Sequence, residues 1–220
     1  MQIGIIGAGR IGGNAARMLA AGGHEVLVSF ARDQAQLAEL AAGIGSAARA
    51  TTPPEAAAAE VVLLSVPWGV VDQALAQAGP LDGRIVIDTT NQFGPGGVVD
   101  LAPDTTAVQI NAAKAPGARW TKSFNTLTVG FQAEAAGRTG PDRVVLFLCG
   151  DDATAKQTVG GLIDDAGFAP VDLGGLADAA VMEAPRRAGA VYGEEYHLDD
   201  ALAVQAAVRK GEPIPPVPKY

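Results

Sequence analysis

Short apolar runs alternate along the chain with alanine-rich amphipathic segments. Residues 3–6, 61–66 and 144–148 are almost entirely apolar, which is typical of strands covered on both faces in a parallel sheet. Residues 11–21 and 33–42 instead place apolar side chains on one helical face, and Gly22 ends the first of these segments. Strands that alternate with helices from the first residues predict a doubly wound α/β fold with a mainly parallel sheet.

The remaining elements continue this alternation. Further strands are expected at residues 25–29, 47–50, 84–88, 106–110, 121–124 and 169–173. Further helices are expected from the prolines at 53 and 54 and at residues 152–165, 176–183 and 198–210. Residues 91–97 give a strong turn signal.

Residues 7–12 lie between the first strand and the first helix and fit the pattern G-x-G-x-x-G: Gly7, Ala8, Gly9, Arg10, Ile11 and Gly12. Gly7 permits a tight turn, Gly9 lets the backbone approach a pyrophosphate, and Gly12 lets the helix pack close to the sheet. The helix N-terminus offers free N–H groups to the phosphates. This motif in this position predicts a Rossmann-type dinucleotide-binding domain.

The end of the second expected strand decides which dinucleotide binds. NAD-binding proteins of this fold place an acidic residue there to hold the ribose 2′-hydroxyl. This chain has no acid before Arg32, and an arginine there can pair with a 2′-phosphate while Ser29 adds a hydroxyl donor. The sequence therefore favours NADP over NAD. The alternative is that Arg32 is a solvated surface charge and that Asp33 caps the next helix.

Ligands of such sheets bind at the carboxyl ends of the strands. Val66, Pro67 and Trp68 follow the strand at 61–66 closely enough to lie at this edge. Trp68 is expected either to form a wall beside the nicotinamide or to pack at the start of a helix.

Amide and hydroxyl side chains reach the same edge from two other strands. Asn91 and Gln92 follow the strand at 84–88, and Asn125 and Thr126 follow the strand at 121–124. These groups are expected either to fix a carboxamide or flavin-like ring, or to cap their own loops.

Residues 137–142, a Gly- and Pro-containing stretch, mark the best candidate for a domain boundary. We expect residues 1–140 to form the dinucleotide-binding Rossmann domain. Residues 141–220 are then a smaller C-terminal α/β lobe with an extended tail. The apolar C-terminal helix and the proline-rich tail suggest a possible homodimer.

Charge and composition narrow the function classes. The formal net charge of −8 disfavours binding to nucleic acid or to anionic membranes. No targeting segment or bilayer-spanning run is apparent, so we expect a cytoplasmic protein. Cys149 is the single cysteine, and its place at the end of an apolar run predicts a buried thiol. The sequence shows no residues at metal-ligand spacing, so we expect no metal site.

Several stretches together resemble one known family: GAGRIG, GHEVLV with Arg32 beyond it, LLSVPW, KSFNTL, CGDDATAK and LIDDAGFAPVDLGGL. They extend from residue 1 to about residue 185 and are similar to the coenzyme F420-dependent NADP oxidoreductases. KSFNTL also resembles the reductase domain of transmembrane ferric reductases.

This resemblance implies NADPH held by residues 7–10 with Arg32 at the 2′-phosphate. It also implies that Val66 and Trp68 line the nicotinamide side, and that a deazaflavin docks between the main domain and the C-terminal lobe.

The chain lacks an obvious acid–base residue near the expected site. His24 precedes the second strand, and His197 lies among acidic residues. Lys114 and Lys122 remain, and a structural ion pair is the preferred interpretation of Lys122. This pattern favours hydride transfer between NADP(H) and a deazaflavin or flavin, in which the cofactors carry the chemistry. Two alternatives stay open: an NADP-dependent reductase of a small carbonyl or imine with Lys114 or Lys122 as proton donor, and a non-catalytic NADP(H)-sensing protein.

Overall fold

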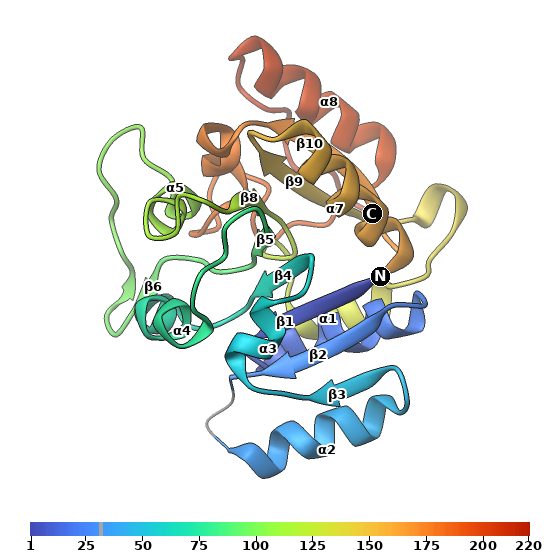
Figure 1. Cartoon of the computed structure of the whole chain (residues 1–220). Coiled ribbons are helices and arrows are strands. Elements are labelled where there is room, and N and C mark those ends of the chain that lie inside the picture. The colour runs from blue at the N-terminus through green and yellow to red at the C-terminus, as the bar shows by residue number, and fades with distance from the viewer. Residues whose placement is uncertain (31–32) are drawn as a thin grey trace.

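The computed structural model describes residues 1–30 and 33–220 of the chain (Figure 1). In this part of the chain the strands form an eight-stranded sheet and a separate hairpin. The strands of the sheet are β1 (Gln2–Ile6), β2 (Glu25–Ser29), β3 (Ala48–Ala50), β4 (Val61–Leu64), β5 (Ile85–Asp88), β8 (Arg119–Lys122), β9 (Val145–Gly150) and β10 (Ala169–Gly174). The hairpin consists of β6 (Phe93–Gly94) and β7 (Gly97–Val98).

The helices connect these strands. The α-helices are α1 (Arg10–Ala21), α2 (Gln34–Ile44), α3 (Pro53–Ala57), α4 (Val71–Ala78), α5 (Ala107–Ala112), α6 (Val129–Ala135), α7 (Ala153–Asp165) and α8 (Leu198–Lys210). The 3₁₀ helices are η1 (Trp68–Val70), η2 (Gly140–Asp142) and η3 (Leu176–Met182). Among the described residues, no helix combines the length and apolar character needed to cross a membrane.

The sheet has the strand order β10-β9-β8-β5-β4-β1-β2-β3. Its described strands pair in parallel, apart from β8 and β9, which pair antiparallel. Because β1 lies between β2 and β4, the chain reverses its direction of winding there, and a crevice is expected at the carboxyl ends of these strands. The predicted Rossmann-type, doubly wound α/β fold is confirmed.

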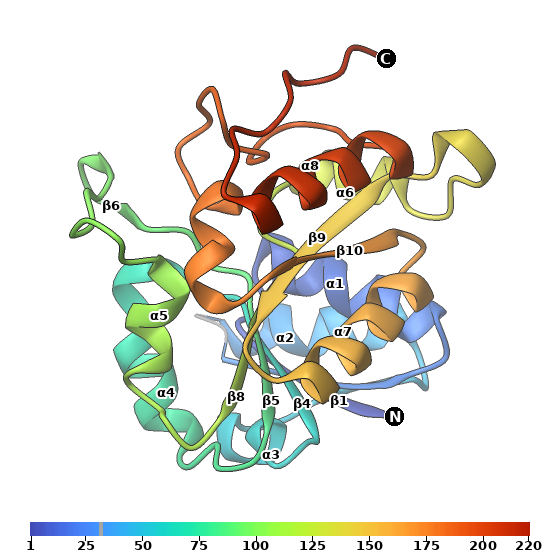
Figure 2. The ribbon, with the colours of Figure 1, turned by 90° about the horizontal axis from the view of Figure 1, so that it is seen from above.

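Two apolar layers lie between the sheet and the helices, one on each face. Both layers arise because successive side chains of a strand point to opposite faces of the sheet. In β4, Val61 and Leu63 face one layer, whereas Val62 and Leu64 face the other. The helices α1, α2, α6 and α7 contribute to the first layer, and α3, α4, α5, η3 and α8 contribute to the second. Figure 2 shows α4 and α5 together on one side of the central strands and α1, α2 and α7 on the other. This double burial is the reason for the continuous apolar runs in the sequence.

One predicted element is wrong. Residues 106–110 were expected to form a strand, but Ala107–Ala112 is helix α5. Thr106 caps this helix: its hydroxyl accepts the N–H of Gln109, and the Gln109 side chain accepts the N–H of Thr106. This reciprocal capping favours a helix over the strand that the β-branched residues suggested. The stretch expected as a helix at 176–183 is the 3₁₀ helix η3.

The segment beyond residue 140 adds β9 and β10 to the same sheet through the antiparallel pairing of β8 with β9. The division into residues 1–140 and 141–220 stays a prediction. The homodimer also stays a prediction. Helix α8 exposes the apolar side chains of Leu198 and Leu202.

Candidate functional site

The glycine motif at residues 7–12, which joins β1 to the first turn of α1, is shaped by close packing at Gly7 and Gly12. Gly7 has φ +107°, and a Cβ there would lie 2.2 Å from the Ser65 carbonyl oxygen. A Cβ on Gly12 would lie 2.0 Å from the Gly7 carbonyl oxygen. Gly9 differs, because a Cβ there would meet nothing within 4 Å. Gly7 and Gly12 therefore shape the turn, and Gly9 leaves an open backbone surface.

This open surface is the N-terminus of a helix. Helix α1 begins at Arg10, and Gly9 supplies no side-chain cap to its first N–H groups. Arg10 is exposed, whereas Ala8 and Ile11 are half-buried. An uncapped helix start with an adjacent guanidinium fits the pyrophosphate of a dinucleotide.

The end of β2 lies beside this loop. The Ser29 carbonyl accepts the Gly7 N–H at 3.0 Å, and the Ser29 hydroxyl donates to the Ile5 carbonyl at 2.9 Å. Since Ser29 is fully buried and its one donor is used inside the sheet, the 2′-phosphate prediction rests on Arg32. Arg32 lies outside the described residues. Asp33 accepts the Ala35 N–H and so caps α2, which confirms the helix cap that the sequence suggests for Asp33.

The loop after β4 forms the next part of the edge. A Cβ on Gly7 would come within 2.8 Å of the Val66 side chain, so the buried Val66 lies against the glycine turn. Pro67 is exposed, and Trp68 is half-buried at the start of η1. The Lys114 amine lies 5.6 Å from the centre of a Trp68 ring and 2.8 Å from the Asp72 carboxylate.

The amides after β5 and β8 are joined to one another. The Asn91 side chain donates to the Asn125 carbonyl at 3.1 Å, and the Asn125 side chain donates to the Asn91 amide oxygen at 3.2 Å. Phe124, directly before Asn125, is fully buried with φ +58°. Gln132 holds this strained turn by donating to the carbonyls of Phe124 and Leu127. Strain of this kind in a non-glycine residue often marks a functional region.

The same amides hold a segment from the C-terminal part of the chain, residues 182–184. Asn125 donates to the Met182 carbonyl at 2.6 Å, and Asn91 accepts the Ala184 N–H at 3.2 Å. Gln92 donates to the Ala184 carbonyl at 2.7 Å. We call Asn91, Gln92 and Asn125 the amide rim. Thr126 is buried next to it, and its carbonyl accepts the Gly193 N–H.

An ion group of Lys122, Asp88 and Glu183 is buried next to the amide rim. The Lys122 amine lies 3.6 Å from the Asp88 carboxylate and 3.4 Å from the Glu183 carboxylate, and it donates to the Thr90 carbonyl. The Lys122 side chain is 0% exposed. The prediction of a structural ion pair for Lys122 is confirmed. The sequence interpretation missed the partners Asp88 and Glu183, since nothing in the local pattern connects them.

The remaining candidates lie elsewhere or are inaccessible. His24 pairs with Asp165 at 3.0 Å, and His197 pairs with Glu195 and stacks on Tyr220. Cys149 is fully buried, as expected, and this burial raises the pKa of its thiol well above the usual range.

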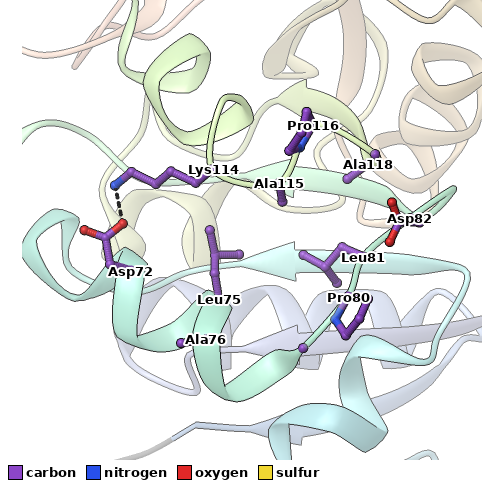
Figure 3. Close-up of a pocket in the computed structure, with 12 residues that line it drawn as sticks. Asp72, Leu75, Ala76, Pro80, Leu81, Asp82, Lys114, Ala115, Pro116 and Ala118 are labelled. Atoms are coloured by element: carbon purple, nitrogen blue, oxygen red, sulfur yellow. Dashed lines mark ion pairs between the residues drawn. The ribbon is translucent and has the colours of Figure 1, made fainter.

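Two pockets flank the site. A pocket of about 200 Å³ lies between the loop after the amide rim and the 182–184 segment, and Gln92, Glu183, Ala184 and Arg187 help to line it. A larger groove of about 420 Å³ extends along α4, with Leu75 and Leu81 in its wall (Figure 3). The Lys114–Asp72 ion pair lies at one end of this groove and Asp82 at the other. The glycine loop does not line either pocket.

Comparison with known proteins agrees with this geometry. Residues 2–92 match the family model described as NADP oxidoreductase, coenzyme F420-dependent. A structure of a hypothetical protein from Sinorhizobium meliloti is 32% identical, with a TM-score of 0.79, over 90% of this chain and 97% of that chain. A putative F420-dependent NADP reductase from Arthrobacter sp. FB24 is 25% identical, with a TM-score of 0.70, over 81% of this chain and 87% of that chain.

Over residues 2–92 the chain is similar to the coenzyme F420-dependent NADP oxidoreductases. The family of this model and the Arthrobacter neighbour are NADP-dependent oxidoreductases or reductases, and the matched region begins with β1 and includes the glycine loop. The chain is also 29% identical over 184 residues to the metalloreductase STEAP3 of Rattus norvegicus. That match covers 83% of this chain and 36% of the relative, so this chain spans about a third of the curated relative it matches.

Proposed function

We propose that the protein transfers a hydride between NADP(H) and a deazaflavin of the coenzyme F420 type, or a flavin. The observation that carries this proposal is the state of Lys122. Lys122 is one of the two lysines considered as a proton donor, yet its amine is fully buried and bound by two carboxylates. A side chain in that state cannot deliver a proton to a substrate, which fits a reaction in which the protein orients two rings.

The nucleotide side of the site would be formed by residues 7–12, with the helix α1 N-terminus at the pyrophosphate. Arg32 would pair with the 2′-phosphate. Val66, Pro67 and Trp68 would cover the nicotinamide from the β4 side. NADPH supplies the hydride when it is bound, and the chain supplies position and exclusion of water.

The acceptor side would be formed by Asn91, Asn125 and Thr126 together with the 182–184 segment. The pocket of about 200 Å³ beside Gln92 and Ala184 supports this assignment. Its walls come from the loop after β5, including the β7 end of the hairpin, and from the C-terminal part of the chain, where the family resemblance implies that a deazaflavin docks.

A second candidate is an NADP-dependent reductase of a small carbonyl or imine, with Lys114 as proton donor. One observation favours it: the Lys114 side chain is 28% exposed and its amine lies above Trp68, at the expected nicotinamide side. The proton donor in this candidate is accessible, unlike Lys122.

One experiment separates the two candidates. NADPH oxidation is followed with an F420-type deazaflavin or FMN, and in parallel with small ketones and cyclic imines. We expect rapid oxidation with a ring acceptor only, and a Lys114→Met variant that keeps ring turnover within about threefold. Turnover of ketones or imines that is lost in Lys114→Met supports the second candidate instead. Tight NADPH binding without turnover of any acceptor contradicts both.

A further inference from the structure

Three distant parts of the chain meet in the Lys122 ion group. Asp88 is the last residue of β5, Lys122 is the last residue of β8, and Glu183 directly follows η3. All three are buried, with exposures of 0%, 0% and 2%. The group therefore joins the central sheet to the C-terminal part of the chain at the edge where ligands are expected.

Each carboxylate of the group has further donors. Asp88 accepts the Thr90 N–H at 2.7 Å and the Asn111 side-chain amide at 2.9 Å. Glu183 accepts the backbone N–H groups of Ala107 and Val108 at 2.7 and 3.0 Å. Two carboxylates around one ammonium are thus balanced by oriented N–H groups. Buried ion groups contribute little net stability compared with apolar packing, and fixing a unique arrangement is one role they can have.

The neighbours of these three residues make the contacts of the amide rim. Asn91 lies three residues after Asp88, and Asn125 lies three residues after Lys122. Met182 and Ala184, on either side of Glu183, are the residues that the rim amides bind. Lys122 thus binds Glu183, while the rim amides bind its two neighbours.

We propose that Lys122 is a positioning residue. Through Asp88 and Glu183 it fixes the 182–184 segment against the amide rim and thereby sets the shape of the acceptor side of the site. The link to the acceptor rests on the proposed function, because Glu183 and Ala184 line the pocket assigned there to the acceptor. The nucleotide side does not depend on the group, since residues 7–12 are shaped by contacts with Ser65 and with one another.

The test uses two variants of the group and a matched control in the full chain. Lys122→Met removes the ammonium. Glu183→Gln keeps the shape of the side chain and removes one charge, so it remains informative if Lys122→Met does not fold. Lys156→Met removes a lysine that pairs with Asp172 at 2.9 Å, at β10, outside the candidate site.

Two kinds of measurement are made on each variant. Hydrogen exchange of the Ala184 amide reports on the segment itself and needs no substrate. The dissociation constant of NADPH and the KM of the ring acceptor report on the two sides of the site separately. We expect Ala184 exchange and the acceptor KM to rise by about tenfold or more in both variants of the group. The NADPH dissociation constant stays within about twofold, and Lys156→Met changes none of the three.

Each other result overturns part of the proposal in a distinct way. Unchanged Ala184 exchange in a folded variant shows that the group does not fix the segment. Faster exchange with an unchanged acceptor KM shows that the segment does not shape the acceptor side. A loss of NADPH affinity as large as the rise in the acceptor KM shows that the group does not act on the acceptor side specifically. A native protein that turns over no ring acceptor refutes the proposed function, whereas the exchange result still decides whether Lys122 fixes the segment.

Discussion

The carboxyl edge of the sheet has two halves that are built in opposite ways. Around β1, β2 and β4, the glycine turn exposes backbone N–H groups at the start of α1 and has few polar side chains. Around β5 and β8, the amide rim and the Lys122 ion group contain buried polar side chains that bind one another and nearby backbone carbonyls.

The difference teaches how each half depends on the rest of the molecule. A backbone anion site needs only a correct local turn, whereas a buried polar cluster needs several elements in register. The nucleotide half should therefore respond to changes in local geometry, and the acceptor half to the loss of distant partners.

The largest expected effect concerns the packing of the glycine turn. Gly7→Ala places a Cβ against the Ser65 carbonyl at positive φ, and we expect it to lower the free energy of unfolding by about 2–5 kcal/mol. Urea denaturation measures this loss. Gly23→Ala is the control, because Gly23 also has positive φ but open space around it, so only about 1–2 kcal/mol of backbone strain is expected. Equal losses in both variants would show that the close contact with Ser65 contributes nothing.

The next prediction tests which nucleotide the first half selects. Arg32→Glu should weaken NADPH binding by about 2–5 kcal/mol and affect NADH much less, because the new carboxylate repels the 2′-phosphate. Titrations with both coenzymes measure the difference. Arg84→Glu makes the same change in net charge just before β5, at the opposite edge of the sheet, and should leave both affinities nearly unchanged. Equal weakening of NADPH and NADH by Arg32→Glu would contradict the assignment.

Gly9 separates binding from folding within the same loop. Gly9→Ala has room for its Cβ, so the midpoint of thermal unfolding should stay close to that of the native protein. The added methyl group lies on the surface assigned to the pyrophosphate, and we expect an affinity loss of about tenfold, or about 1.4 kcal/mol, for NADPH and NADH alike. An unchanged affinity in a folded variant would place the pyrophosphate elsewhere.

The smallest expected effect comes from the other end of β8. There Arg119 and Asp152 form a bidentate ion pair, and hydrogen bonds from Arg119 hold the pKa of Asp152 well below its usual range. Because the folded pKa is lowered, the stabilisation is present above the ordinary pKa of an aspartate and is lost as the pH falls through the folded value. The effect should be small, since the pair is partly exposed and screened.

Unfolding measured from neutral to acidic pH checks this sign. Asp152→Asn should lose part of the acid-dependent decline that the native protein shows. A decline of the same size in both proteins would mean that other carboxylates account for it.

Much of the fold could be predicted because the relevant signals are local. Apolar runs located the strands at 61–66 and 144–148, and Asp33 was recognised as a helix cap. The failure at residues 106–110 is also local: β-branched residues suggested a strand, but the reciprocal caps of Thr106 and Gln109 decided for a helix.

The candidate site could be predicted in part for the same reason. The glycine loop was placed correctly at the end of β1, whereas the amides of Asn91 and Asn125 turned out to hold each other and the 182–184 segment. A sequence pattern shows that an amide lies near an edge, but it does not show which backbone groups will use its donors.

The sequence by itself determined the glycine turn of the proposed nucleotide half, because the close contacts that require glycine at positions 7 and 12 are specified within six consecutive residues. Only the tertiary structure decided the acceptor half. Asp88, Lys122 and Glu183 acquire one another as partners when β5, β8 and the segment after η3 reach the same edge, and a buried charge can persist only where such partners are already in place.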